Sequence, residues 1–244
     1  MKRTLKTAAD LDAERIRDNY SRIREEVAAA CSRAGRDPAA VEILTATKYV
    51  DASGLEKLSG AGITLIGENR AQDLTAKHAL YGGRFTWDFI GHLQSNKVRQ
   101  ILPLVRLIHS VDSLSAVAEI DRRTPGQTST NVLLQVNIGQ EAGKYGIIPS
   151  EVDRFLEEAA KYLKVNFTGL MTMPPLADPK VVKPFFTAVR RLASELSQKW
   201  NGRYLFHHLS MGTSRDFAVA VEEGATIVRV GSIVFGTEGI GSPG

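Results

Sequence analysis

The chain has 244 residues, of which 43% are hydrophobic and 24% are charged. This composition is typical of a folded globular protein and excludes a disordered chain or a disulfide scaffold. The net charge is +4, but basic residues alternate with acidic ones along the helical patterns, so we predict no nucleic-acid partner. No apolar run approaches the roughly 18 residues of a membrane span, so we predict no membrane association.

The single cysteine and the N-terminal segment both favour a cytoplasmic protein. Cys31 has no second cysteine with which to form an intramolecular disulfide, and this fits a reducing compartment. The basic opening MKRTLK runs into TAADLDAERIRDNY and not into an apolar segment. We therefore predict no secretory signal.

A helix is predicted at residues 10–34, where apolar side chains recur at helical spacing and Gly35 closes the pattern. The stripe comprises Ile16, Tyr20, Ile23, Val27 and Ala30. No Pro-, Gly- or Ser-rich linker divides the chain. We therefore expect one domain over 1–244, with a leading helix in 1–35 and a flexible tail at 237–244.

Short β-rich runs alternate with helical patterns after this helix. We count eight runs, at 41–47, 63–67, 86–90, 106–109, 131–137, 166–171, 204–209 and 226–230. Alternation of this kind predicts parallel βα units, and eight units in about 250 residues predict a closed (β/α)8 TIM barrel. Active sites of such barrels lie at the carboxyl ends of the strands.

Polar residues and glycines follow nearly every predicted strand, and the set after strands seven and eight suggests an anion site. SMGTS leaves strand seven and opens a helix, and RVGS ends strand eight. Glycines, hydroxyls and free N–H groups at such positions bind phosphate. The candidates are Ser210, Thr213, Ser214, Gly231 and Ser232. The alternative is an ordinary helix cap with turn glycines.

Lys48 ends the first predicted strand, across the mouth from this anion site. A lysine amine can form an imine with a phosphorylated aldehyde, and pyridoxal 5'-phosphate (PLP) is the obvious candidate. Arg229 lies two residues before Gly231 and shares its face of the strand. We expect it to face the pyridine nitrogen and, since it keeps its proton, to make the ring a weak electron sink. A solvated strand-end lysine is the alternative for Lys48.

Three further strand ends complete the predicted pocket, with Asn69, His92 and Met171 as cofactor-binding candidates and Asn137 beside them. No metal site is expected. His207 and His208 are adjacent in a predicted strand, so their side chains should point to opposite faces.

These residues form ordered motifs along nearly the whole chain. They are ATK at 46, IGEN at 66, WDFIGHLQSNK at 87, IHSVDS at 108, LLQVNI at 133, KYGI at 144, GLMTM at 169, LSMGTSRDF at 209, VRVGS at 228 and FG at 235. In these motifs the chain resembles the pyridoxal phosphate homeostasis proteins, which are similar in fold to the barrel domain of alanine racemase. The resemblance implies that Lys48 binds the cofactor, that the SMGTS and GS segments hold phosphate, and that Arg229 faces the pyridine nitrogen. Two positions depart from that family: Thr213 stands where methionine is frequent, and Tyr49 stands where threonine is frequent.

Three functions are compatible with this pocket. The first, which the resemblance favours, is a non-enzymatic carrier that holds PLP as a lysine aldimine, keeps the free aldehyde low and delivers it to apoenzymes. The second is a PLP-dependent amino-acid racemase, which needs a second base from an added domain; only about a dozen residues follow strand eight. The third is a class I aldolase, which would be colourless until it meets its substrate.

Two expectations concern partners. Lys144, in the loop after strand five, could receive the cofactor from Lys48 by transimination, or it could be a surface lysine. We also expect a monomer with transient apoenzyme contacts, because no further domain is predicted.

Overall fold

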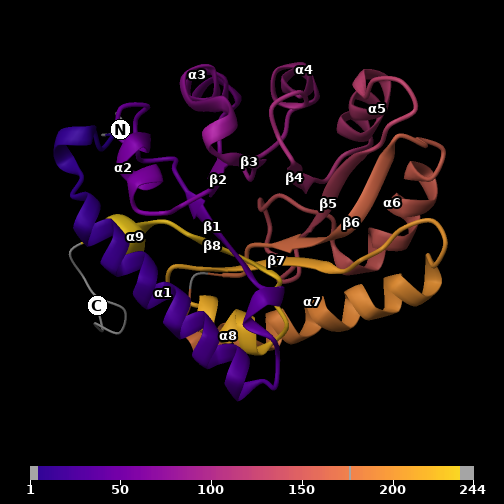
Figure 1. Cartoon of the computed structure of the whole chain (residues 1–244). Helices are drawn as coiled ribbons and strands as arrows, with labels where there is room; N and C mark the ends of the chain where they lie inside the picture. Colours follow the sequence, from indigo (N-terminus) through magenta and orange to yellow (C-terminus); the bar gives the residue numbers. More distant parts are fainter. Residues whose placement is uncertain (1–4, 176, 237–244) are drawn as a thin grey trace.

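The computed structural model describes residues 5–175 and 177–236, and they form a closed barrel of eight parallel strands in the order β1 to β8 (Figure 1). The strands are β1 Glu42–Ala46, β2 Leu65–Glu68, β3 Thr86–Phe89, β4 Leu107–Val111, β5 Thr130–Val136, β6 Val165–Thr172, β7 His208–Thr213 and β8 Ile227–Val230. The predicted (β/α)8 architecture is therefore confirmed. Pairing of β1 with β8 closes the barrel.

Helices surround the barrel on its outside (Figure 1). The α-helices are α1 Ala13–Arg33, α2 Leu55–Gly60, α3 Ala71–Tyr81, α4 Val98–Ile101, α5 Leu114–Arg123, α6 Val152–Ala159, α7 Pro179–Lys199, α8 Phe217–Glu222 and α9 Ser232–Phe235. Short 3-10 turns are η1 Ala8–Asp10, η2 Pro38–Ala40, η3 Gly82–Arg84, η4 Ser95–Lys97 and η5 Pro149–Glu151. Within the described residues, none of the helices is both long and apolar enough to span a bilayer.

Helix α1 confirms the predicted leading helix and begins three residues later than expected. Asp12 caps it by accepting hydrogen bonds from the N–H groups of Glu14 and Arg15, and a capping carboxylate fixes where a helix starts. The predicted apolar stripe is buried except for Tyr20, which is half-buried. The helix packs against α8, α9 and α2 and so covers the junction of the first and last strands.

Two apolar cores hold the barrel together. The larger core lies between strands and helices, and the smaller one fills the inside of the barrel with Leu44, Leu107, Leu133, Met171 and Ile227. Because side chains alternate along a strand, residues two positions beyond these core residues share their inward direction. This alternation determines which side chains reach the carboxyl end of the barrel interior.

The seventh strand was predicted at 204–209 and lies at His208–Thr213 instead. Tyr204 and Phe206 are apolar and buried, which imitates a strand, but their rings pack edge-on against neighbouring aromatic rings outside the ladder. The segment SMGT consequently belongs to the strand itself. His207 precedes the strand, and its ring centroid lies 4.1 Å from that of His208. The prediction of opposite faces for these two histidines was therefore wrong.

The tail predicted over 237–244 lies outside the described residues.

Candidate functional site

Lys48 lies in a turn directly after β1, at the carboxyl end of the barrel. It is four residues beyond the inward-facing Leu44, and its side chain is half-buried. The turn is closed by a 3.0 Å hydrogen bond from the N–H of Val50 to the carbonyl of Thr47. The ammonium nitrogen lies 4.9 Å from the centre of the Tyr49 ring. A cation and an aromatic face thus share this edge of the mouth.

Asn69 follows β2, and its side-chain oxygen is buried without a hydrogen-bond partner among the described residues. The chain after β3 passes directly against it, since a Cβ on Gly91 would lie 1.9 Å from the Asn69 carbonyl oxygen. Glycine is therefore required at position 91. A buried acceptor that finds no protein donor fits a ligand that brings one.

His92 lies on the rim of the mouth and is exposed. Its ring stacks on Tyr145, with centroids 3.7 Å apart and planes inclined by 15°. Tyr145 comes from the loop after β5, so the stack connects loops from two separate strands. Lys144, next to Tyr145, is exposed and forms an ion pair with Glu141 at 2.5 Å. Asn137 holds the same loop by donating to the Glu141 carbonyl at 2.9 Å.

The loops after β7 and β8 are joined by Ser214, whose hydroxyl accepts a 3.0 Å hydrogen bond from the N–H of Gly231. Gly231 also lies close to the end of β1, because a Cβ built on it would be 3.4 Å from the Ala46 carbonyl oxygen. Ser232 is exposed and begins α9. The predicted anion-binding loops therefore lie beside the end of β1, two residues before Lys48.

Thr213 has its donors engaged within the chain. Its backbone N–H and its hydroxyl both donate to one carboxylate oxygen of Asp216, at 2.6 and 3.0 Å. Asp216 immediately precedes α8. Thr213 can contribute to an anion site only after releasing this carboxylate.

Arg229 and Ser210 lie deeper, inside the barrel. Arg229 is only 6% exposed, and it donates to the Ser210 hydroxyl and, at 2.8 Å, to the Thr172 carbonyl. Burial lowers the pKa of Arg229 to about 10, and nearby Asp216 opposes this effect. The guanidinium therefore stays protonated near neutral pH. Ser210 was predicted to touch phosphate, but its hydroxyl lies between Arg229 and a histidine.

That histidine, His109, is fully buried and was not among the predicted site residues. Its Nδ1 lies 2.8 Å from the Ser210 hydroxyl, and its Nε2 lies 3.1 Å from Asp88. Burial lowers the pKa of His109, with the Asp88 carboxylate acting in the opposite direction. The imidazole is therefore neutral at physiological pH.

Asp88 and Arg106 extend this chain of contacts to the base of the barrel, and sequence reasoning missed both. Arg106 donates to both oxygens of Asp88, at 2.8 and 3.1 Å, and also binds Glu42. Burial alone would raise the pKa of Asp88, but the bonds from His109 and Arg106 outweigh it and lower the pKa. A charged residue inside the apolar strand TWDF was the available signal, because buried charges need partners.

Met171 is 2% exposed and belongs to the inner apolar core. It supports the floor beneath the mouth, and its neighbour Met173 accepts a contact from Arg229 at 2.9 Å.

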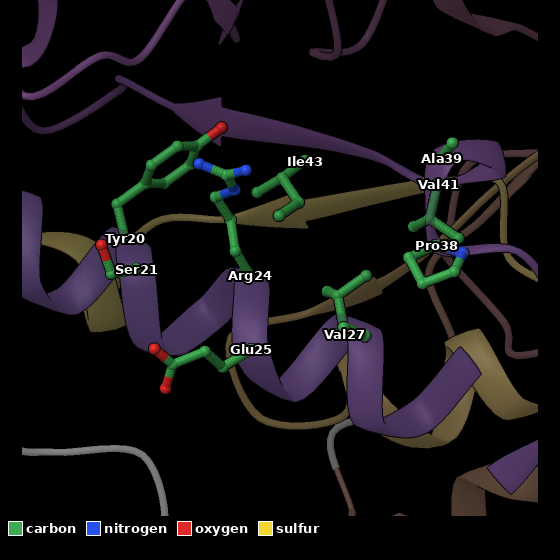
Figure 2. A pocket seen from close by; sticks show the side chains of 10 residues that line it. Tyr20, Ser21, Arg24, Glu25, Val27, Pro38, Ala39, Val41 and Ile43 are labelled. Carbon is green, nitrogen blue, oxygen red and sulfur yellow. The ribbon is translucent and has the colours of Figure 1, made fainter. Parts of the chain in front are cut away.

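Two cavities lie outside this mouth. One, of about 610 Å³, runs between α1 and the outer side of β1 (Figure 2). Its walls include Tyr20, Arg24, Val27, Val41 and Ile43, and burial raises the pKa of Tyr20. The other, of about 720 Å³, lies along α7 and the loop after β5. Neither includes a predicted site residue, and the described residues contain no cluster of three metal-ligating side chains.

Comparison with known proteins shows which family this chain belongs to. The family model described as alanine racemase, N-terminal domain, matches residues 11–239. A pyridoxal phosphate homeostasis protein of Aquifex aeolicus is 40% identical over 222 residues, which are 90% of this chain and 96% of that protein.

Solved structures agree. A protein from Bifidobacterium adolescentis matches with a TM-score of 0.83 and 31% identity, covering 95% of this chain and 98% of that one. PipY of Synechococcus elongatus, solved with PLP bound, matches with a TM-score of 0.74 and 32% identity over 88% of this chain and 100% of its own. The chain therefore belongs to the pyridoxal phosphate homeostasis proteins, which share the barrel domain of alanine racemase.

Proposed function

We propose that this protein binds PLP at the carboxyl end of the barrel, holds it through Lys48 and supplies it to apoenzymes. One observation carries the proposal. β1 and β8 are neighbours, and Gly231 of the anion loop approaches the end of β1, two residues before Lys48. This proximity supports a site in which the Lys48 amine and the proposed phosphate-binding groups come from adjacent strands.

The residues present fit such a ligand. Ser214 and Ser232 would hold the phosphate, because a hydroxyl and a short helix start offer donors to an anion. The Gly231 N–H would join them after releasing the Ser214 hydroxyl. Arg229 would face the pyridine nitrogen as a charged donor. The buried oxygen of Asn69, which has no hydrogen-bond partner among the described residues, would accept from the ligand's phenolic hydroxyl. PLP supplies an aldehyde that a primary amine can trap.

Lys48 would form the covalent link. PLP would supply the aldehyde, and the Lys48 amine would be the nucleophile that bonds to its carbon, with the aldehyde oxygen lost as water. Delivery to an apoenzyme would exchange one amine for another: the recipient's lysine amine would take the place of Lys48, and the Lys48 amine would be set free. No oxidant or reductant is needed.

A carrier role is favoured over a racemase role by the relatives, which are named for pyridoxal phosphate homeostasis, and Arg229 is compatible with it. Because its pKa of about 10 keeps the guanidinium protonated, it gives the ring nitrogen no proton, and an unprotonated ring stabilises a carbanion poorly. The second candidate, a racemase-like enzyme, predicts exchange of the α-proton of alanine in D₂O. The cytoplasmic location and the monomeric state remain predictions from the sequence.

The test combines absorption spectroscopy with chemical mapping. We expect the protein mixed with PLP to turn yellow and, after borohydride reduction, to carry the label on Lys48. Lys48→Ala should abolish both signals, and Lys161→Ala, an exposed lysine beyond α6, should leave both unchanged. A label on another lysine, or colour that persists in Lys48→Ala, would overturn the proposal.

Delivery needs its own measurement. PLP-loaded protein should reactivate a PLP-dependent apoenzyme while a scavenger removes free aldehyde, and Lys144→Ala tests whether that loop lysine takes part. If the scavenger blocks reactivation completely, the protein stores PLP but does not hand it over.

A further inference from the structure

A buried ion pair lies immediately beside the segment that carries Lys48. Glu68, the last residue of β2, has a fully buried side chain, and Lys77 from α3 reaches it with a side chain only 6% exposed. Buried ion pairs are costly to desolvate, so their retention needs a reason. Neither residue belongs to the proposed ligand contacts.

Both members of the pair bind Thr47, the residue before Lys48. Lys77 donates to the Thr47 carbonyl at 2.9 Å, and the Thr47 hydroxyl donates to the Glu68 carboxylate at 2.5 Å. The Thr47 N–H donates to the Gly67 carbonyl at 3.0 Å. Every polar group of Thr47 is therefore fixed by β2 or α3.

This anchoring matters because β1 ends at Ala46, so Lys48 lies beyond the strand ladder. The turn that carries it depends on the bond from Val50 to the Thr47 carbonyl, the same carbonyl that Lys77 holds. Any rotation of the Thr47 peptide would therefore change the direction in which Lys48 leaves the backbone.

We infer that the Lys77–Glu68 pair is a positioning device that orients Lys48 for attack on the bound aldehyde. The inference rests on the proposed role of Lys48. The pair also determines which lysine reacts: Lys77 is buried and committed to two acceptors, whereas Lys48 is half-buried at the mouth. Misplacing a reacting group by about 1 Å can cost on the order of 100-fold in rate.

The principal test is Lys77→Met, which keeps the length of the side chain but removes its charge and its donors. We expect the second-order rate constant for imine formation at Lys48 to fall at least about tenfold. Lys77→Arg should restore part of the rate because it returns a charged donor. In the ligand-free protein, hydrogen exchange of the Val50 amide should become faster in Lys77→Met.

Leu74→Ala is the matched control, since Leu74 is fully buried on the same helix and does not contact Thr47 through a hydrogen bond. It should lower stability while leaving both the imine rate and the Val50 exchange unchanged. Equal rates in Lys77→Met and the wild-type protein, or an equal loss in Leu74→Ala, would overturn the inference.

Thr47→Val is the second variant if Lys77→Met does not fold, because it removes only the hydroxyl, with its bonds to the Glu68 carboxylate and to the Gly67 carbonyl. It should also slow imine formation at Lys48, and an unchanged rate would overturn the inference. If the wild-type protein forms no imine at Lys48, the proposed function fails instead. The Val50 exchange rates then decide alone whether the pair positions this turn.

Discussion

His109 connects Ser210 to Asp88 through opposite sides of one buried imidazole, at 2.8 and 3.1 Å. The Asp88 carboxylate only accepts, so we assign the imidazole proton to Nε2. Nδ1 then accepts from the Ser210 hydroxyl, whose oxygen accepts from Arg229. One polar chain thus crosses the barrel interior from the mouth to its base, with a partner for each group.

Asp88→Asn should destabilise the protein strongly. The substitution removes the only negative charge between Arg106 and His109 in this chain of contacts and places an amide donor against existing donors. Loss of a hydrogen bond to a charged group typically costs about 1.5–3 kcal/mol in the free energy of unfolding. Urea unfolding followed by circular dichroism measures the effect.

Glu42→Gln is the control for this prediction, because Glu42 binds the same Arg106 with a side chain 38% exposed. An exposed pair contributes about 0–1 kcal/mol. Equal losses of unfolding free energy in Asp88→Asn and Glu42→Gln would show that the burial of Asp88 does not increase its contribution to stability.

Stability should also depend on pH through His208. Burial, followed by the nearby His207, lowers the pKa of His208 to about 4, with further influence from Glu42, Arg106 and His109. The pKa of His208 in the folded protein lies below its unfolded value near 6.5. The neutral imidazole therefore makes its full contribution to the free energy of unfolding above pH 6.5. This contribution is lost as pH falls from 6.5 toward 4.

His208→Gln removes this contribution. The loss of unfolding free energy between pH 7 and pH 5 should be smaller in the variant by about 1 kcal/mol, allowing for the partial exposure of the ring. Chemical unfolding of both proteins at both pH values gives these free energies. The carboxylates titrate in both proteins, so their effect cancels when the variant is compared with the wild type. Parallel curves for the two proteins would contradict the assignment.

The backbone around Gly169 leaves no space for a side chain. It pairs with His208 between β6 and β7, and a Cβ at this position would lie 2.0 Å from the His208 carbonyl oxygen. Gly169→Ala should therefore force the strands apart and cost up to about 3 kcal/mol. Thermal unfolding measures the loss.

Gly60→Ala is the opposite case, because Gly60 ends α2 and nothing lies within 4 Å of its built Cβ. Alanine there should stabilise the protein by about 0.5–1 kcal/mol. Destabilisation at Gly60, or tolerance at Gly169, would contradict the packing described.

The barrel was predictable because strand and helix periodicities alternate regularly, and Lys48 was conspicuous because it ends an apolar strand. The seventh strand was misplaced because Tyr204 and Phe206 are buried for a reason other than strand pairing. Local pattern reports burial, but it does not report which layer a side chain enters.

The contacts around the site could not be predicted from local pattern for a related reason. Lys77 reaches Glu68 from a helix, and Arg106 joins Asp88 from a loop before another strand. Such pairs depend on how elements pack. The Thr213 bonds to Asp216 depend on the backbone path of a loop, for which the sequence offers several conformations.

Ser214 offers the most specific test of the anion site. Its hydroxyl accepts from the Gly231 N–H at 3.0 Å and so holds the loops after β7 and β8 together where we place the phosphate. Ser214→Ala should weaken PLP binding about tenfold, which corresponds to one hydrogen bond to a charged group. Binding of pyridoxal, which lacks the phosphate, should not change.

Ser21→Ala, on the exposed side of α1, is the control and should alter the affinity for neither ligand. Titration by fluorescence gives the dissociation constants of both ligands for the wild-type protein and for each variant. An equal loss for PLP and pyridoxal would place Ser214 in the general structure of the mouth and not in the phosphate site.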